Sequence, residues 1–341
     1  MDERKKKVLA AIVQDYVNTA EPVGSRTIAR KYNLGVSPAT IRNEMADLEE
    51  LGYIEQPHTS AGRVPSDLGY RYFVDFLMER YLLNNQEEEM IRQRFNQRMQ
   101  EMENVIQRAT ELLSQITNYT AVVLGPHLYR ATFQHIQLLP LAPTRALLVV
   151  VTNARVVEHH VLDIPASMTR QDLERVSQVL NSKLRGLALE QVRKDVLREI
   201  YRNLDLQRQV LNAVMELLEQ SFRSDREEKV YLGGTLNILN QPEFKDVAKL
   251  KTLLGVLEEG KLLRELLQDE AGAGLSVRIG GENRYQEISE CSLVTATYEI
   301  DGQVVGKVGI LGPTRMDYPK AMALVEFITQ NLSEALAKWV K

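Results

Sequence analysis

The sequence has a single cysteine, few aromatic residues and no long apolar run. Cys291 is the one cysteine among 341 residues, and aromatic residues make up 6% of the chain. One cysteine excludes an internal disulfide framework and a metal site built from several cysteines, and it is compatible with a reducing cytoplasm. No stretch approaches the roughly 20 apolar residues of a membrane helix, and residues 1–5 are mostly charged, unlike a signal peptide. We therefore expect a cytoplasmic protein without a membrane partner.

The sequence also lacks the motifs of common enzymes. It contains no His-Glu-X-X-His, no Gly-X-Ser-X-Gly and no Walker phosphate loop. Gly233 and Gly234 are adjacent, but neither a Gly-Lys-Ser/Thr ending nor a third spaced glycine follows them. The histidines are scattered along the chain: His58, His127, His135, His159 and His160. We expect no catalytic activity, no cofactor and no metal ion.

The most informative stretch is residues 37–52, which predict one helix with both ends marked. Ser37 is suited to cap the N-terminus and Pro38 to the first helical position, while Gly52 permits the left-handed turn that ends a helix. Four apolar residues recur at helical spacing and predict a buried stripe. They are Ile41, Met45, Leu48 and Leu51.

The opposite face of this helix predicts DNA recognition. Ala39, Asn43 and Ala46 lie there, with Arg42 and Asp47 beside them. Small residues let a helix lie close in a major groove, where asparagine reads adenine and arginine reads guanine.

The surrounding segments complete a winged helix-turn-helix. A first amphipathic helix begins near Glu3, and a second, capped by Ser25, covers 26–32 before a turn at 33–36. Two short extended runs, 53–56 and 63–65, flank a turn-rich tip. The alternative is a small helical domain that binds protein instead of DNA.

The charge of the N-terminal segment is balanced. The whole chain has a net charge of −4, and residues 1–80 contain eleven Lys and Arg against twelve Asp and Glu. Local placement therefore has to supply the positive surface, and a weakly charged monomer favours operator binding by two subunits. Six basic residues are expected on the docking side: Arg26, Arg30, Lys31, Arg42, Arg63 and Arg71.

Three motifs closely resemble the HrcA family of bacterial heat-inducible transcription repressors. They are Pro-Val-Gly-Ser-Arg at 22–26, Ser-Pro-Ala-Thr-Ile-Arg-Asn-Glu-Met at 37–45, and Gln-Pro-His-Thr-Ser-Ala-Gly-Arg-Val-Pro at 56–65. The third is the most specific. The resemblance implies a CIRCE inverted-repeat operator ahead of chaperone operons, nucleoid association when bound, and dependence on the GroE chaperonin that is lost on heat stress.

We expect one set of residues to bind DNA. Ala39, Arg42 and Asn43 are expected to read bases. Contacts to the backbone or groove are expected from Arg26, Ser37, Thr40, Thr59, Ser60 and Arg63.

The remainder of the chain predicts further helices and strands. A helix begins at Ser66–Asp67, and a long charged helix covers 86–117, with a heptad seam that suits either a coiled coil or packing on its own sheet. Strands are expected at 120–124, 132–139, 145–152, 156–162, 229–239, 275–279, 291–300 and 303–311. Further helices are expected after Ser167 and at 189–201, 206–222, 245–258, 261–268 and 318–339.

These elements predict an α+β multidomain protein. The expected parts are a winged helix-turn-helix domain (1–80), a connecting helix (86–117), a GAF-like α/β sensor-type domain (118–165 and 270–341) and an inserted, mostly helical dimerisation domain (166–269). The helix at 206–222 is the candidate dimer surface. The resulting hypothesis is a homodimeric repressor that binds double-stranded operator DNA. The alternatives are a repressor controlled by a small molecule in the GAF-like domain, and a protein-interaction scaffold.

Overall fold

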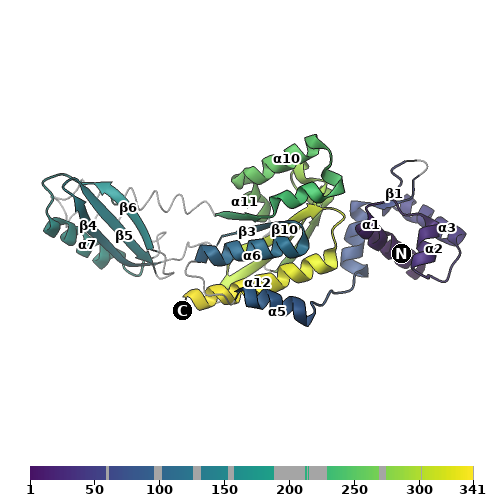
Figure 1. The fold of residues 1–341 in the computed structure, drawn as a ribbon, viewed down its shortest axis with the longest axis horizontal. Helices are drawn as coiled ribbons and strands as arrows, with labels where there is room; N and C mark the ends of the chain where they lie inside the picture. Colours follow the sequence, from purple (N-terminus) through teal and green to yellow (C-terminus); the bar gives the residue numbers. More distant parts are fainter. Residues whose placement is uncertain are drawn as a thin grey trace. The chain divides into compact units, whose positions relative to one another are not determined.

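The computed structural model describes residues 1–58, 61–95, 102–125, 132–152, 157–187, 212, 214, 229–268, 274–300 and 302–340. It is a mixed α/β structure that divides into two compact units (Figure 1). The first unit combines Met1–Gly125 with Val230–Trp339, and the second consists of Pro126–Lys229 with Val340–Lys341.

The first unit begins with an N-terminal module of three helices and a short hairpin, in the order that the sequence predicts. The helices are α1 (Glu3–Thr19), α2 (Ser25–Lys31) and α3 (Pro38–Glu50), and the hairpin pairs β1 (Ile54–Glu55) with β2 (Val64–Pro65). Apolar residues at helical spacing meet in one core. It includes Val8, Leu9, Ile12, Val13, Ile28, Ile41, Met45, Leu48 and Ile54.

The module is followed by the helix predicted at Ser66–Asp67. The Ser66 side chain accepts a hydrogen bond from the Gly69 amide at 3.1 Å and caps α4 (Asp67–Tyr72). The chain continues as a π-helical turn, Phe73–Leu77. Tyr70 and Phe73 are buried in the same core as the first three helices, so this segment packs on the N-terminal module.

The rest of the first unit is built on a five-stranded antiparallel sheet. Its strand order is β7-β3-β10-β9-β8. The strands are β3 (Thr120–Leu124), β7 (Val230–Gly233), β8 (Leu275–Ile279), β9 (Cys291–Ile300) and β10 (Gln303–Pro313). All five residues of β3 are buried, because helices cover both faces of the sheet.

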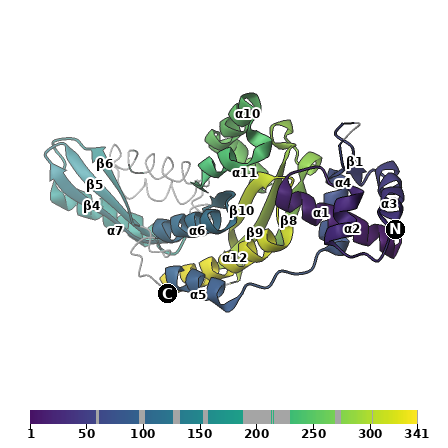
Figure 2. The ribbon, with the colours of Figure 1, turned by 45° about the vertical axis from the view of Figure 1, so that its right-hand side comes forward.

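The two faces carry different helices (Figure 2). On one face, α6 (Met102–Thr117) and α12 (Tyr318–Val340) pack against Ala121 and Val123. On the other, α11 (Gly260–Gln268) packs near Val122 and Leu124, and α10 (Val247–Glu258) shares a core with Leu293 and Leu311. The last helix, α12, packs through one apolar face. Its six residues, Ala321, Leu324, Val325, Ile328, Leu332 and Leu336, are buried.

The long helix predicted at 86–117 is described as two helices, α5 (Asn85–Phe95) and α6, with residues 96–101 outside the described chain. Ile106, Ala109 and Leu113 of the heptad seam are fully buried in the core of their own unit. Of the two alternatives, packing on its own sheet is therefore the one observed for α6.

The second unit contains a separate three-stranded sheet. Strands β4 (Phe133–Ala142), β5 (Arg145–Thr152) and β6 (Val157–Asp163) pair in sequence order, and α7 (Arg170–Leu184) packs on β4. The sequence suggests that these strands share one sheet with the C-terminal strands, but they form a sheet of their own, so that prediction is wrong. Alternating apolar residues predict a strand but not its partner, because strand pairing is a long-range property.

An insertion is present, but its limits differ from those expected. In the sequence, residues 126–229 of the second unit are inserted between β3 and β7, which are neighbours in the sheet of the first unit. The inserted unit includes residues 132–163, which the sequence assigns to the GAF-like domain. It excludes α10 and α11, which the sequence assigns to the insertion. The helices expected at 189–201 and 206–222 fall almost entirely outside the described residues.

Two local predictions also need correction. Thr169, not Ser167, caps α7, in a reciprocal pair with Asp172. The strand expected at 229–239, with a break at Gly233 and Gly234, covers only Val230–Gly233. After the break, Gly234 takes a positive φ of 65° and leads into a 3-10 helix, Thr235–Asn240, and not into a second stretch of strand. No helix in the described part of the chain is long and apolar enough to cross a membrane.

Candidate nucleic-acid interface

The third helix has the capped ends that its sequence predicts. The Ser37 hydroxyl oxygen accepts a hydrogen bond from the Thr40 amide at 3.1 Å, and Pro38 occupies the first turn. Gly52 follows the helix with a φ of 78°. The cap satisfies an amide that a helix N-terminus otherwise leaves unpaired, so the start of α3 is well defined.

The outward face of α3 is available to a partner. Ala39, Arg42, Asn43 and Ala46 are exposed. Within the described chain, Arg42 has no hydrogen bond or ion pair, so its guanidinium retains all its donors for a ligand. The arrangement presents one cationic fork and one amide among small residues, as predicted.

The buried face differs from the prediction at one position. Leu51 is 53% exposed, because the helix ends at Glu50 and Leu51 is already its C-cap. Glu44 is instead 8% exposed and belongs to the inward side. A helix that buries a carboxylate needs a cationic partner for it.

That partner comes from α1. The Lys5 ammonium lies 3.0 Å from a carboxylate oxygen of Glu44 and 2.9 Å from one of Asp47. Hydrogen bonds with Asp47, Glu44 and Asp2 raise the pKa of Lys5. Arg4 adds a further ion pair to Glu44 at 3.4 Å. These contacts fix α3 against α1 and therefore fix the direction in which its outer face points.

The second helix supplies two unengaged arginines. Gly24 is its N-cap, so Ser25 is the first residue of the helix and not the cap we predicted. Arg26 and Arg30 are exposed, and the described residues offer neither of them a partner.

Three of the other expected docking residues have intramolecular partners. Lys31 forms an ion pair with buried Asp15 at 2.6 Å, and Arg63 forms one with Glu49 at 2.7 Å. Arg71 pairs with Glu282 and donates to the Val277 carbonyl at 2.7 Å. The free positive charge at the candidate interface therefore comes from Arg26, Arg30 and Arg42.

The wing is held by backbone pairing that the sequence did not indicate. Val23 and Arg63 exchange two hydrogen bonds, of 2.8 and 2.9 Å, so the segment before α2 forms a bridge with the wing. The Gln56 side chain donates to the Ala61 carbonyl at 3.1 Å across the base of the tip. Thr59 and Ser60, the predicted wing contacts, lie outside the described residues.

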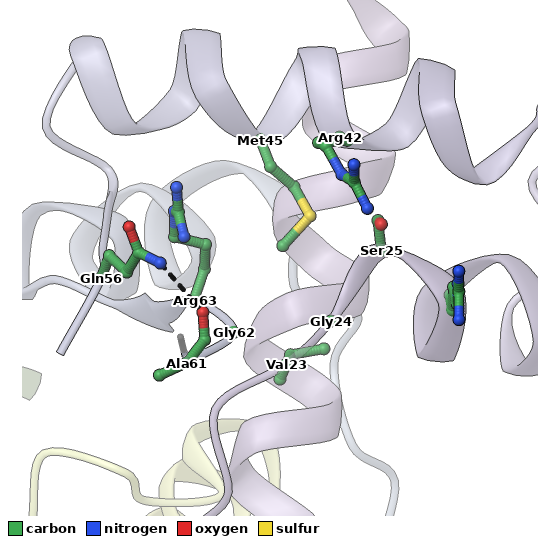
Figure 3. A pocket seen from close by; sticks show the side chains of 10 residues that line it. Val23, Gly24, Ser25, Arg42, Met45, Gln56, Ala61, Gly62 and Arg63 are labelled. Carbon is green, nitrogen blue, oxygen red and sulfur yellow. Dashed lines mark hydrogen bonds between the residues drawn. The ribbon is translucent and has the colours of Figure 1, made fainter. Parts of the chain in front are cut away.

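A pocket of about 540 Å³ lies between α2, α3 and the wing (Figure 3). Figure 3 shows Arg42 and Met45 reaching into this region from α3, with Ser25 and Gly24 on one side and Arg63 on the other. Its lining is Val23, Gly24, Ser25, Arg26, Arg42, Met45, Gln56, Ala61, Gly62 and Arg63. Arg26 and Arg42, which have no carboxylate partner among the described residues, make this pocket cationic.

Contacts with the remainder of the first unit anchor the N-terminal module. Arg315 donates to the carbonyl of Val17, in the last turn of α1, at 2.6 Å and to Glu243 at 2.6 Å. Desolvation lowers the pKa of Arg315, but the hydrogen bond and the charge attraction to Glu243, with smaller contributions from Tyr119 and Tyr70, together raise it above its ordinary value. The Asp67 carboxylate accepts from the Gly281 amide at 2.8 Å. Arg315 and Val17 are 298 residues apart in sequence, and Asp67 and Gly281 are 214 apart, which is why sequence reasoning missed these contacts.

Comparisons with known proteins agree on one family. A family model described as the HrcA protein C terminal domain matches residues 103–322. A heat-inducible transcription repressor HrcA of Pelotomaculum thermopropionicum is 53% identical over 100% of this chain and 98% of its own length. The protein of the same name from Moorella thermoacetica is 53% identical over 98% of both chains.

One solved structure shares the fold. It is described as a hypothetical protein and is 23% identical to this chain. The match covers 99% of both chains with a TM-score of 0.63.

Proposed function

The chain belongs to the HrcA family of heat-inducible transcription repressors, and from this premise we propose that it represses transcription by binding operator DNA through the exposed face of α3. Members of this family are repressors and not enzymes. The observation that carries the proposal is the capped helix α3, which exposes Ala39, Arg42 and Asn43 together. The N-terminal module is then a winged helix-turn-helix.

The three outward residues have complementary roles at base edges. Arg42 offers a bidentate fork to guanine, and Asn43 pairs its amide with adenine. Ala39 lets the helix approach closely and contacts a thymine methyl group. All three side chains are exposed and none contributes to the core of the module, so packing does not restrict which residues occupy these positions.

Phosphate contacts orient the helix in the groove. We assign them to Ser37 and Thr40 at the N-terminus of α3, to Arg26 on α2, and to wing residues Thr59 and Ser60. The N-terminus of a helix favours an anion because its amides and its dipole point toward it. Arg26 adds a full positive charge without a competing carboxylate in the described residues.

The protein acts as a homodimer on an inverted repeat. Residues 1–80 are close to neutral, with eleven basic and twelve acidic side chains, so one module alone has modest affinity for a polyanion. Two modules separated by a fixed distance bind two half-sites at once, which multiplies affinity without new contacts.

We infer the operator and the regulation from the resemblance to the HrcA family. The operator is the CIRCE inverted repeat, and the GroE chaperonin keeps the repressor active in the cytoplasm. On heat stress, unfolded proteins occupy the chaperonin and the repressor loses activity. A change of about 1–2 kcal/mol in folding free energy alters an active fraction several-fold, so a marginally stable repressor responds steeply to chaperonin supply.

A mobility-shift titration tests this proposal. Purified protein is titrated against a CIRCE duplex and a scrambled duplex of the same composition, at 50 and 200 mM salt, with and without GroE. We expect preferential binding of the CIRCE duplex as a dimer, weakened at the higher salt concentration because counterions are released on binding. Equal affinity for both duplexes, or no salt dependence, would contradict operator recognition.

A further inference from the structure

An ion pair joins the wing to the C-terminal turn of α3. The Nε of Arg63 donates to Oε2 of Glu49 at 2.9 Å, and the guanidinium nitrogen Nη2 of Arg63 lies 2.7 Å from the same oxygen. The Arg63 side chain is only 21% exposed and that of Glu49 is 35% exposed. Two donors directed at one carboxylate oxygen make this the strong, charge-assisted kind of hydrogen bond.

The backbone on both sides of this pair is also constrained. Residue 63 exchanges two hydrogen bonds with Val23, which leads directly into α2. At Gly62, a Cβ atom would lie 2.5 Å from the backbone of Val23, so only glycine fits this approach. The side chain of Arg63 therefore starts from a fixed position and reaches toward α3.

The position of Glu49 in the helix also favours a cationic partner. Glu49 lies in the last turn of α3, where the helix dipole disfavours a negative charge, and Glu50 follows it directly. Arg63 neutralises Glu49 at that point. A guanidinium used in this way, and mostly buried, is poorly available to a phosphate group.

From these contacts we propose that Arg63 is a positioning residue, which sets the angle between the wing and the recognition helix by binding Glu49, and is not a DNA contact. The inference rests on the proposed function. Arg42 and Arg63 line the same pocket, so its width follows from the Arg63–Glu49 pair. Operator specificity then depends on Glu49, an acidic residue that itself repels DNA.

The test is a double-mutant cycle on the full-length protein. Arg63→Gln, Glu49→Gln and the double variant are titrated against the CIRCE duplex and the scrambled duplex over a series of salt concentrations. We expect each single variant to lose about fivefold in affinity for CIRCE. The double variant should lose no more affinity than the single variant that binds CIRCE less tightly, because the two substitutions break the same interaction. The salt slope should stay unchanged, since no phosphate contact is lost.

Glu50→Gln is the matched control. Glu50 is exposed, adjacent to Glu49, and without a partner among the described residues, so this change removes the same charge without breaking an ion pair. It should leave affinity unchanged or slightly increase it. Arg63→Lys provides a conservative variant: lysine retains the charge but not the fork, so it should lose specificity too.

The opposite pattern overturns the inference. A phosphate contact at Arg63 predicts that Arg63→Gln reduces the salt slope by about 0.9, that Arg63→Lys binds normally, and that Glu49→Gln tightens binding as Glu50→Gln does. Thermal midpoints measured on every variant identify any that fails to fold. If Arg63→Gln fails to fold, the binding of Arg63→Lys to CIRCE decides between the two predictions. If the wild-type protein binds CIRCE but the cycle is additive, only this inference fails; if the wild type does not bind, the proposed function fails.

Discussion

At the residue scale, the partner of each basic side chain decides whether it is available to DNA. Six basic residues were expected on the docking side, but Lys31, Arg63 and Arg71 bind carboxylates of their own chain. Their partners lie 16, 14 and 211 residues away in sequence. Helical periodicity identifies the outward position of Arg42 but contains no information about such long-range pairs.

The cap at Ser37 leads to a residue-scale prediction. Ser37→Ala removes the acceptor of the Thr40 amide and should lower the unfolding free energy by about 1 kcal/mol. Ser37→Asn keeps a capping acceptor and should retain stability. Urea unfolding measures this difference, and equal losses in both variants would show that capping is not what Ser37 contributes.

At the element scale, periodic helices were predictable and strand partners were not. The first helix, α3 and α12 were located to within a few residues, because a single amphipathic stripe specifies where each buries its face. The strands β4–β6 were also located, but not the sheet to which they belong. Likewise, the seam of α6 indicated a buried face without indicating that β3 and β7 cover it.

The contact between α1 and Arg315 gives a prediction at this scale. Arg315→Met leaves the Val17 carbonyl and the Glu243 carboxylate without their donor, which should lower the unfolding free energy by about 1–3 kcal/mol. Lys249→Met is the matched control, because its pair with Glu290 is half exposed and should change stability by less than about 1 kcal/mol. Thermal unfolding of the two variants checks this, and equal midpoints would mean that Arg315 does not anchor α1.

At the scale of the whole molecule, the proposed DNA-reading surface and the core that supports it belong to one unit, whose sequence is interrupted by the second unit. The chain leaves the five-stranded sheet after β3 and returns at β7, so the fold of the first unit depends on residues more than 100 positions apart. Long-range pairing of this kind forms slowly and exposes strand edges before it is complete. Such folding supports the proposal that the active fraction of this repressor depends on a chaperonin.

The most direct test of the central claim measures base reading by α3. Arg42→Ala, Asn43→Ala and the wild type are titrated against CIRCE and against duplexes with single substitutions in each half-site. We predict that Arg42→Ala loses about 1–3 kcal/mol on CIRCE and becomes indifferent to one base pair per half-site, and that Asn43→Ala becomes indifferent to another. Wild-type affinity and wild-type base preference in both variants would contradict the account.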